Sequence, residues 1–340
     1  LVKLKDIASY SKGTQINGEE LIDEAEFDYL NGGINPSGKW NEANCEGNTI
    51  TISEGGNSCG YINFMKKSFW CGAHCYYLYD TVKNTQYLYY ALKSQQDKIM
   101  KLRSGACMPN IKKVDLGNFE FWYDNDINEQ ERITTILSKL ERVIELRKQE
   151  LSFFDLIISA RFVEMFGDPI RNTHNRHTTE FSNVVKMQRG FDLPVQARQR
   201  CGDIPVYGSN GVLDYHNVAK IQGGGVITGR SGTIGKVFYT EDDYWPLNTS
   251  LFSVDTHGNN VIYLAYLLQM FDLSRFVEGT GVPTLNRNMF NDKQIIDVSR
   301  YEQEQFADFV KGVDKSKVAV RKALEETQLL FDSLMQQYFG

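Results

Sequence analysis

A glycine-rich segment at residues 228–236 has the residue types of a phosphate-binding turn. It reads Thr-Gly-Arg-Ser-Gly-Thr-Ile-Gly-Lys and is followed by Val237. A nucleotide-binding P-loop requires glycine where this segment has Arg230, and a Mg²⁺-binding serine or threonine where it has Val237. Nucleotide binding is therefore disfavoured. We expect instead that backbone N–H groups, Arg230 and Lys236 contact phosphate, and that Arg230 can also make a bidentate contact to guanine. The alternative is a simple hairpin turn in which glycine supplies positive φ.

The segment at residues 71–75, Cys-Gly-Ala-His-Cys, has the residue types that bind zinc, with Cys45 or Cys59 as further ligands. Its spacing falls short of a paired Cys-x-x-Cys site. The matching segment of an internal repeat, described below, has Pro246 and Leu247 in place of ligands. We therefore predict no metal site, expect small residues packed in a strand, and consider that His74 faces a ligand instead. Six cysteines in 340 residues do not make a disulfide scaffold, so reduced thiols are expected.

No grouping of residues predicts a catalytic site. Residues 35–38, Asn-Pro-Ser-Gly, lack the second proline and the aromatic residue of a methyltransferase Asn/Asp-Pro-Pro-aromatic loop. There are five histidines, and none stands in the context of a hydrolase triad. The carboxylates show no spacing that singles out a metal-binding pair. The sequence therefore favours a binding protein with no cofactor of its own over an enzyme.

The elements that position these residues are predicted by an internal duplication at an offset of about 173–178 residues, which runs through nearly the whole chain. Its last part keeps one constant offset of 173, which indicates an uninterrupted helix at the end of each copy. The matched pairs include Gly13 with Gly190, Ile52 with Ile227, Gly60 with Gly235, Trp70 with Trp245, the turn at 105–111 with that at 279–285, Gln130 with Gln303, and Phe166 with Phe339.

Within each copy, short apolar runs separated by Gly and Asn turns predict strands, for example at 226–228 and 236–239. Apolar residues at spacings of three and four predict short helices at 87–94 and 263–270. The predicted fold class is α+β, with a first globular domain at 1–127, a central helix at 128–167, a linker at 168–178, a second globular domain at 179–300 and a C-terminal helix at 301–340.

Both long helices carry an alternating four-three apolar spacing, sustained over more than four heptads, which predicts a coiled coil. The alternative is that each helix packs on its own globular domain. If a pseudo-twofold axis relates the two copies, the helices pair antiparallel, with one globular domain at each end. The predicted contact positions are Ile133, Leu137, Leu140, Ile144, Arg147, Leu151, Phe154, Ile158, Arg161 and Met165 in the first helix, and Phe306, Val310, Val313, Lys317, Val320, Leu324, Thr327, Phe331, Leu334 and Tyr338 in the second.

Composition is that of a folded protein, with 41% hydrophobic and 24% charged residues. The sequence has no apolar run long enough to span a membrane, so we expect a cytoplasmic location. The net charge is −6, and neither copy is strongly basic. Because phosphate neutralisation supplies most non-specific affinity for DNA, a DNA-binding role would need a partner that supplies positive charge.

Two dissimilar globular domains joined by an antiparallel helical spacer resemble the specificity subunit of type I restriction-modification enzymes. Residues 228–239 and the turn at 281–286, Gly-Val-Pro-Thr-Leu-Asn, are similar to the recognition-domain signature of that family. The first copy departs from it, because residues 53–61 read Ser-Glu-Gly-Gly-Asn-Ser-Cys-Gly-Tyr. That divergence suits two domains that read different half-sites.

The resemblance implies that each globular domain is a target-recognition domain that reads one half of a bipartite DNA target, while the helices set the spacer. It implies two methyltransferase subunits as partners, and restriction subunits in the full complex. S-adenosylmethionine, ATP and Mg²⁺ are then expected on those partners. A coiled-coil scaffold that binds only proteins, and a self-contained nuclease or modification enzyme, are the alternatives.

Polar side chains beside glycines are the predicted DNA contacts, because Asn, Gln and Arg match the donors and acceptors of base edges. They are Lys12, Gln15, Asn31, Asn35, Lys39, Asn57, Ser58, His74, Arg103, Asn110 and Lys112 in the first domain, and Arg189, Tyr207, Ser209, Asn210, Arg230, Thr233, Lys236, Asn248, Asn286 and Arg287 in the second.

Overall fold

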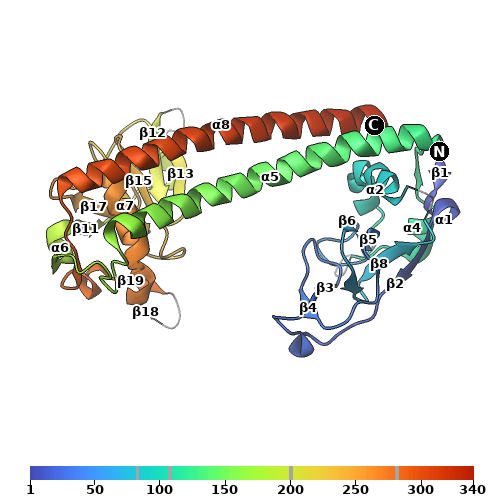
Figure 1. Ribbon diagram of the computed structural model, residues 1–340, viewed down its shortest axis with the longest axis horizontal. Helices are drawn as coiled ribbons and strands as arrows, with labels where there is room; N and C mark the ends of the chain where they lie inside the picture. Colours follow the sequence, from blue (N-terminus) through green and yellow to red (C-terminus); the bar gives the residue numbers. More distant parts are fainter. Residues whose placement is uncertain (82–83, 106–108, 199–201, 280–282) are drawn as a thin grey trace. The chain divides into compact units, whose positions relative to one another are not determined.

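The chain folds into two compact units, which a computed structural model describes at residues 1–81, 84–105, 109–198, 202–279 and 283–340 (Figure 1). Unit 1 comprises Leu1–Arg147 and Ala323–Gly340, and unit 2 comprises Lys148–Lys322. The helices α5 (Ile127–Phe166) and α8 (Arg300–Phe339) each contribute residues to both units. Parts of the two matched turns, at 106–108 and 280–282, lie outside the described residues, as do Cys107 and Cys201.

Unit 1 is built on a four-stranded antiparallel sheet and a three-stranded mixed sheet. Its described strands are ordered β2-β8-β5-β6 in one sheet, β4-β3-β7 in a second and β1-β9 in a third. The elements are β1 (Val2–Lys3), α1 (Leu4–Ile7), β2 (Ser9–Lys12), η1 (Gly18–Glu20), β3 (Phe27–Leu30), β4 (Gly38–Trp40), β5 (Thr49–Ser53), β6 (Ile62–Met65), β7 (Phe69–Cys71), β8 (Cys75–Tyr79), α2 (Thr85–Ser94), α3 (Gln96–Met100), α4 (Lys113–Gly117) and β9 (Glu120–Phe121).

Unit 2 repeats this arrangement. Its described strands are ordered β11-β17-β14-β15, β13-β12-β16 and β10-β20, with a further pair β18-β19. The elements are β10 (Thr178–Glu180), α6 (Phe181–Val184), β11 (Lys186–Arg189), η2 (Val195–Ala197), β12 (Ile204–Gly208), β13 (Gly211–His216), β14 (Gly225–Gly229), β15 (Val237–Thr240), β16 (Trp245–Pro246), β17 (Ser250–Asp255), α7 (Val261–Phe271), η3 (Leu273–Phe276), β18 (Val277–Glu278), β19 (Thr284–Leu285), η4 (Arg287–Met289) and β20 (Gln294–Ile296).

The three sheets of unit 1 match three of the four described sheets of unit 2 in strand order, which confirms the internal duplication. The predicted short helices and the strands flanking the glycine-rich turn are confirmed as α2, α7, β14 and β15. The alignment was wrong by one residue in one strand. Ile52 pairs with Tyr76 and Thr228 pairs with Leu251, so Ile52 corresponds to Thr228 and not to Ile227.

A close backbone approach explains one matched glycine pair. A Cβ on Gly13 would lie 1.9 Å from the carbonyl oxygen of Cys71, and a Cβ on Gly190 would lie 2.2 Å from that of Leu247. Only glycine fits such a contact. The same tight crossing of the two neighbouring sheets is therefore present in both units.

In unit 1 the two helices run antiparallel and cover the globular part. The Arg132 guanidinium lies 5.5 Å from the ring centroid of Tyr338, and Arg147 donates hydrogen bonds to the Ala323 carbonyl and the Thr327 hydroxyl. Ile133 and Leu137 are buried in the same apolar core as α2 and Phe339. The helices thus pack both on each other and on the domain beneath them.

In unit 2 the pairing is likewise antiparallel. The Lys317 side chain is 8% exposed, and its ammonium forms an ion pair of 2.7 Å with the Asp155 carboxylate. Nearer the end of α5, Arg161 lies 5.8 Å from the ring of Phe309. Every predicted contact position on α5 and α8 is buried or half-buried, which confirms the predicted apolar face.

The end of α5 departs from the predicted spacing. Phe162 and Phe166 are fully buried, whereas the predicted positions Arg161 and Met165 are only half-buried. Both rings pack on Tyr263 of α7 and on Phe306. A straight α-helix drifts relative to a heptad repeat, so here α5 turns a different face to the globular part of unit 2.

A buried glutamine ties each globular part to its helix. Gln303 donates to Asn259 Oδ1 at 2.6 Å and to the Val298 carbonyl at 2.8 Å, and it accepts from the Asn260 N–H at 2.9 Å. Its repeat partner Gln130 is also buried and donates to the Asp124 carbonyl at 2.6 Å. The matched Glu-Gln-Glu segments therefore have a structural role.

In the described part of the chain, no helix combines the length and the apolar character that a membrane span requires.

Candidate nucleic-acid interface

The glycine-rich turn of unit 2 begins where strand β14 ends. The Arg230 N–H donates to the Thr249 carbonyl at 2.9 Å, and the Arg230 carbonyl accepts from the Leu285 N–H at 2.8 Å. A Cβ on Gly229 would lie 1.7 Å from the Thr233 carbonyl oxygen, and Gly232 and Gly235 have φ of +83° and +90°. These glycines are therefore required by the turn itself. The turn holds the backbone of Arg230 between two neighbouring strands.

Arg230 lines a cavity of about 860 Å³. Among the described residues its guanidinium has no hydrogen-bond or ion-pair partner, although it is half-buried. The cavity brings together four of the predicted DNA contacts: Arg189, Arg230, Asn286 and Arg287. The other lining residues are Gln188, Gly190, Phe191, Asp192, Leu251, Glu278, Thr284 and Leu285. Arg287 also donates to the Met187 carbonyl at 3.1 Å, which fixes its position.

Further predicted contacts lie close to the same turn and to the cavity lining. Lys236 Nζ donates to Asn210 Oδ1 at 2.9 Å. A Cβ on Gly229 would lie 2.8 Å from the Ser209 carbonyl oxygen, so Ser209 and Thr233 both approach this glycine. Asn248 donates to Asp192, and its own carbonyl accepts from Arg189 at 3.4 Å. The turn thus collects polar side chains that are distant in the sequence.

Tyr207 was wrongly predicted to contact DNA. It is 8% exposed, and its ring packs edge-on against Tyr244 at 5.9 Å within an apolar cluster that includes Ile227 and Phe252. What remains accessible borders a pocket that also holds the carboxylates of Asp242 and Asp243. A tyrosine beside a glycine turn belongs here to the core, and its surroundings would repel phosphate.

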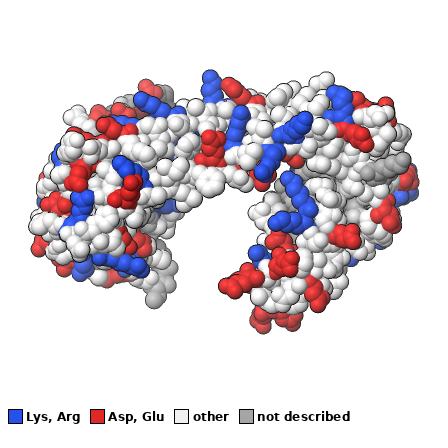
Figure 2. Space-filling view, viewed as in Figure 1, with Lys and Arg blue, Asp and Glu red and all other residues white. Residues whose placement is uncertain are grey.

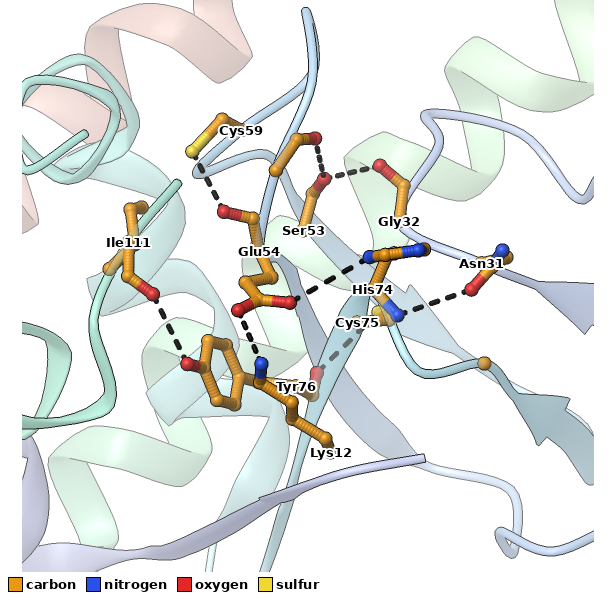
Figure 3. A network of polar contacts seen from close by, with 12 residues as sticks. Lys12, Asn31, Gly32, Ser53, Glu54, Cys59, His74, Cys75, Tyr76 and Ile111 are labelled. Carbon is orange, nitrogen blue, oxygen red and sulfur yellow. Dashed lines mark hydrogen bonds and ion pairs between the residues drawn. The ribbon is translucent and has the colours of Figure 1, made fainter. Parts of the chain in front are cut away.

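In unit 1 the matching region holds a polar network centred on Glu54 (Figure 3). Lys12 forms a close ion pair with Glu54 Oε1, and His74 Nδ1 lies 3.9 Å from Glu54 Oε2. The Glu54 side chain is 13% exposed, against 45% for Lys12 and 63% for His74. The carboxylate is therefore recessed between two cationic or polar groups that reach the surface.

Backbone contacts draw other predicted residues of unit 1 to the same place. Asn31 Oδ1 accepts from the His74 N–H at 3.2 Å, and the Ser58 hydroxyl donates to the Gly32 carbonyl at 2.6 Å. Asn110 forms a bridge with Gly55, the residue after Glu54. Burial raises the pKa of Tyr76 to about 12, so its hydroxyl stays protonated and donates to the Ile111 carbonyl at 3.1 Å.

The remaining predicted residues of unit 1 are exposed but are not drawn into this network by any described contact. Gln15 donates to the neighbouring Ile16 carbonyl at 3.1 Å, and Lys39 lies opposite Asp28 in the β3–β4 pair. The others in this group are Asn35, Asn57, Arg103 and Lys112. Sequence reasoning missed Glu54, because only amide, basic and hydroxyl side chains were considered.

The cysteine segment is part of the core of unit 1. Cys71 and Cys75 lie in β7 and β8 and are buried together with Cys45, Leu30 and Phe69. Hydrogen bonding to the Cys45 and Cys75 thiols raises the pKa of the Cys71 thiol, so it remains protonated. Within the residues that the structure describes, no three His, Cys, Asp or Glu side chains are grouped as metal ligands. The expected packing in strands holds for Cys71 and Cys75, whereas Gly72, Ala73 and His74 form the turn between β7 and β8.

Both basic and acidic side chains are present over each unit on the face seen in Figure 2, and acidic ones gather at the lower end of unit 1. The overall charge of −6 agrees with this view. Neither unit presents a broad basic surface on that face. Electrostatic attraction to phosphate would therefore be local to the turns described above.

Comparison with known proteins identifies the family. The family model for the type I restriction modification DNA specificity domain matches residues 1–152 and 178–327. A Mycoplasma genitalium protein named as a type I specificity subunit is 25% identical over 96% of this chain and 90% of its own length. A second such protein, from Mycoplasma pneumoniae, is 32% identical over 61% of this chain and 58% of its own length.

Solved structures share the fold. The crystal structure of a type I restriction-modification S subunit from M. genitalium aligns with a TM-score of 0.68 at 21% identity, over 100% of this chain and 95% of that one. A chain from a structure titled for complex assembly and conformational transition of the type I R-M system aligns with a TM-score of 0.56 at 10% identity, over 99% of this chain and 96% of that one. With two matched segments and two matched units, the chain belongs to the type I restriction modification DNA specificity domain family.

Proposed function

We propose that this chain is the sequence-reading subunit of a type I restriction-modification complex, and that each unit reads one half of a bipartite double-stranded DNA target. The observation that carries the proposal is the repeated turn at the end of β5 and β14, where polar side chains from distant segments converge in both units. Turns of this kind supply backbone N–H groups for phosphate and side chains for base edges. Different side chains on the same frame would then specify different half-sites.

The proposal assigns no catalysis to this chain. Methyl transfer and cleavage would belong to methyltransferase and restriction subunits, which would bind S-adenosylmethionine, ATP and Mg²⁺. Mixed surface charge supports a division of labour in which partners supply most of the affinity for phosphate. The recognition units would supply the sequence preference.

A repeated apolar surface supports docking of two methyltransferase subunits. In unit 2, Leu156 and Ile157 of α5 are 62% and 47% exposed, and in unit 1, Leu329 and Leu330 of α8 are 69% and 50% exposed. The two pairs are related by the same offset of 173 as Phe166 and Phe339. We call each pair a docking pair. Exposed neighbouring apolar side chains at matched positions suit two copies of one partner.

Binding to random-sequence duplex DNA tests the proposal. The chain is incubated with the pool in gel-shift assays, with and without the methyltransferase subunits of its host, and the shifted DNA is sequenced. We expect enrichment of one bipartite motif when the methyltransferase subunits are present. Absence of any sequence preference under both conditions would refute the proposed function.

A further inference from the structure

The two units carry opposite charges at the same backbone position. In unit 1 the Glu54 N–H donates to the His74 carbonyl at 2.9 Å, and the Glu54 carbonyl accepts from the Ile111 N–H at 2.9 Å. In unit 2 the Arg230 N–H and carbonyl make the same two bonds, to Thr249 and Leu285. Glu54 is therefore the structural counterpart of Arg230.

Strand register supports this correspondence independently. Ser53 is the last residue of β5 and pairs with Cys75, and Gly229 is the last residue of β14 and pairs with Ser250. The residue after each strand is Glu54 or Arg230. The following residues, Gly55 and Ser231, form equivalent bridges to Asn110 and Thr284. Side chains of opposite charge, Glu54 and Arg230, therefore extend from the same position of the matching turns.

A neighbouring position keeps its charge. Lys12 pairs with Tyr76 at the end of β2, and Arg189 pairs with Leu251 at the end of β11. These two residues correspond, and both are exposed basic side chains. Each unit thus has a cation suited to phosphate at one site and a variable group at the next. Of these two positions, only the one occupied by Glu54 and Arg230 reverses its charge.

The chemistry of the variable group determines what it can bind. A guanidinium only donates hydrogen bonds, and in the major groove it pairs best with guanine O6 and N7. An ionised carboxylate only accepts, so it is attracted to the cytosine amino group at N4 and repelled by guanine O6 and by phosphate. Lys12 and His74 flank Glu54 on its exposed side, which offsets the repulsion between its carboxylate and the DNA backbone.

Resting on the proposed function, we propose that Glu54 and Arg230 are equivalent base-reading residues, with Glu54 selecting cytosine in one half-site and Arg230 selecting guanine in the other. The Arg230 guanidinium, which has no hydrogen-bond or ion-pair partner among the described residues, lines a cavity and suits direct contact with a base. In unit 1, Glu54 exchanges part of its contact with Lys12 and His74 for the amino group of the base. Lys12 is then released towards phosphate.

The test compares motifs selected from a random duplex pool by the chain with its host methyltransferase subunits. The variants are Glu54→Gln and Arg230→Gln, with Glu120→Gln as a matched control on the exposed surface of unit 1. We expect Glu54→Gln to reduce the preference for cytosine at one position of one half-site by about tenfold. Arg230→Gln should reduce a guanine preference to a similar extent in the other half-site only. Retention of the unaffected half-site shows that each variant is folded and bound.

Three results would overturn the inference while leaving the proposed function standing. One is a normal bipartite motif that is unchanged by Glu54→Gln. Another is an equal loss of affinity on every sequence, which would make the residue a phosphate or structural contact. The third is that Lys12→Met selects the same altered motif as Glu54→Gln, which would mean that Glu54 acts through Lys12. If the unmodified chain selects no bipartite motif, the proposed function itself fails.

Discussion

At the scale of single residues, the two proposed base-reading side chains, Glu54 and Arg230, each follow the last residue of the matching strand in their unit. Arg230 could be identified because glycines at 229, 232 and 235 mark its turn. Glu54 could not, because the duplication was aligned with Ile52 opposite Ile227, which set Gly55 against Arg230. Strand pairing shifts this alignment by one residue. Periodicity and spacing do not determine where a one-residue insertion falls between a strand and its turn.

Gly13 provides a test of the close approach between sheets. Gly13→Ala would place a Cβ 1.9 Å from the Cys71 carbonyl oxygen, and we expect it to lower the free energy of unfolding by about 3 kcal/mol. Gly18→Ala is the matched control, because nothing lies within 4 Å of its Cβ, and it should change stability by less than about 0.5 kcal/mol. Urea unfolding followed by tryptophan fluorescence measures both. Equal stability of the two variants would contradict the packing described.

Lys93 gives unit 1 a pH-dependent stability. Burial lowers the pKa of Lys93 to about 8, below that of an unfolded lysine. Between pH 8 and 9.5 the unfolded chain therefore binds more protons at this site, and the free energy of unfolding should rise with pH. Lys93→Met should remove this rise. In a Trp245→Phe background the remaining tryptophans, at 40, 70 and 122, report on unit 1. A rise of the same size in the Met variant would contradict the assignment.

At the scale of elements, repeated spacing predicted the long helices and much of their contact face. At the end of α5 it missed Phe162 and Phe166, which are fully buried, whereas the predicted positions Arg161 and Met165 are half-buried. It also could not identify Tyr207 as a core residue, since its burial depends on Tyr244 from a distant strand. Local periodicity determines which helix face is apolar. Tertiary packing determines where along the helix that face changes.

The docking pairs can be tested one at a time. Replacing Leu156 and Ile157 with glutamate should reduce the number of bound methyltransferase subunits from two to one, because charges would be buried in that contact. Replacing Leu329 and Leu330 should do the same at the other site. Native mass spectrometry of the assembled complex measures the stoichiometry. Val218→Glu is the control, because it alters an exposed apolar residue outside the helices, and it should leave the number of bound methyltransferase subunits at two. If each double variant still binds two methyltransferase subunits, the docking assignment is contradicted.

At the scale of the whole molecule, the helices α5 and α8 each run through both units, and each has 40 residues, or about 60 Å. A continuous helix of this length could serve as a spacer between half-sites. Inserting one heptad after Arg147 in α5 and another after Lys322 in α8 adds about 10 Å and keeps the apolar spacing. We expect an unread spacer longer by about three base pairs and unchanged half-sites. Methylome sequencing measures both the spacer length and the half-site sequences. An unchanged spacer would contradict the role of the helices as a spacer.

The net charge of −6 follows from the sequence alone, and it is the basis for proposing that partners supply most of the affinity for phosphate. The side chains that define the DNA target could not, because base preference depends on the turns that hold those side chains. In unit 1, Lys12 and His74 reach Glu54 only through the pairing of distant strands, and in unit 2 Arg189 reaches the cavity of Arg230 in the same way.

The central claim is that the two units read two separate halves of one target. Base-resolution methylome sequencing of a host that expresses the chain with its methyltransferase subunits tests this most directly. The account predicts methylated adenine within one motif made of two specified blocks separated by a fixed number of unspecified base pairs, and loss of the motif when the chain is deleted. A single continuous block, or methylation that persists without the chain, would contradict it.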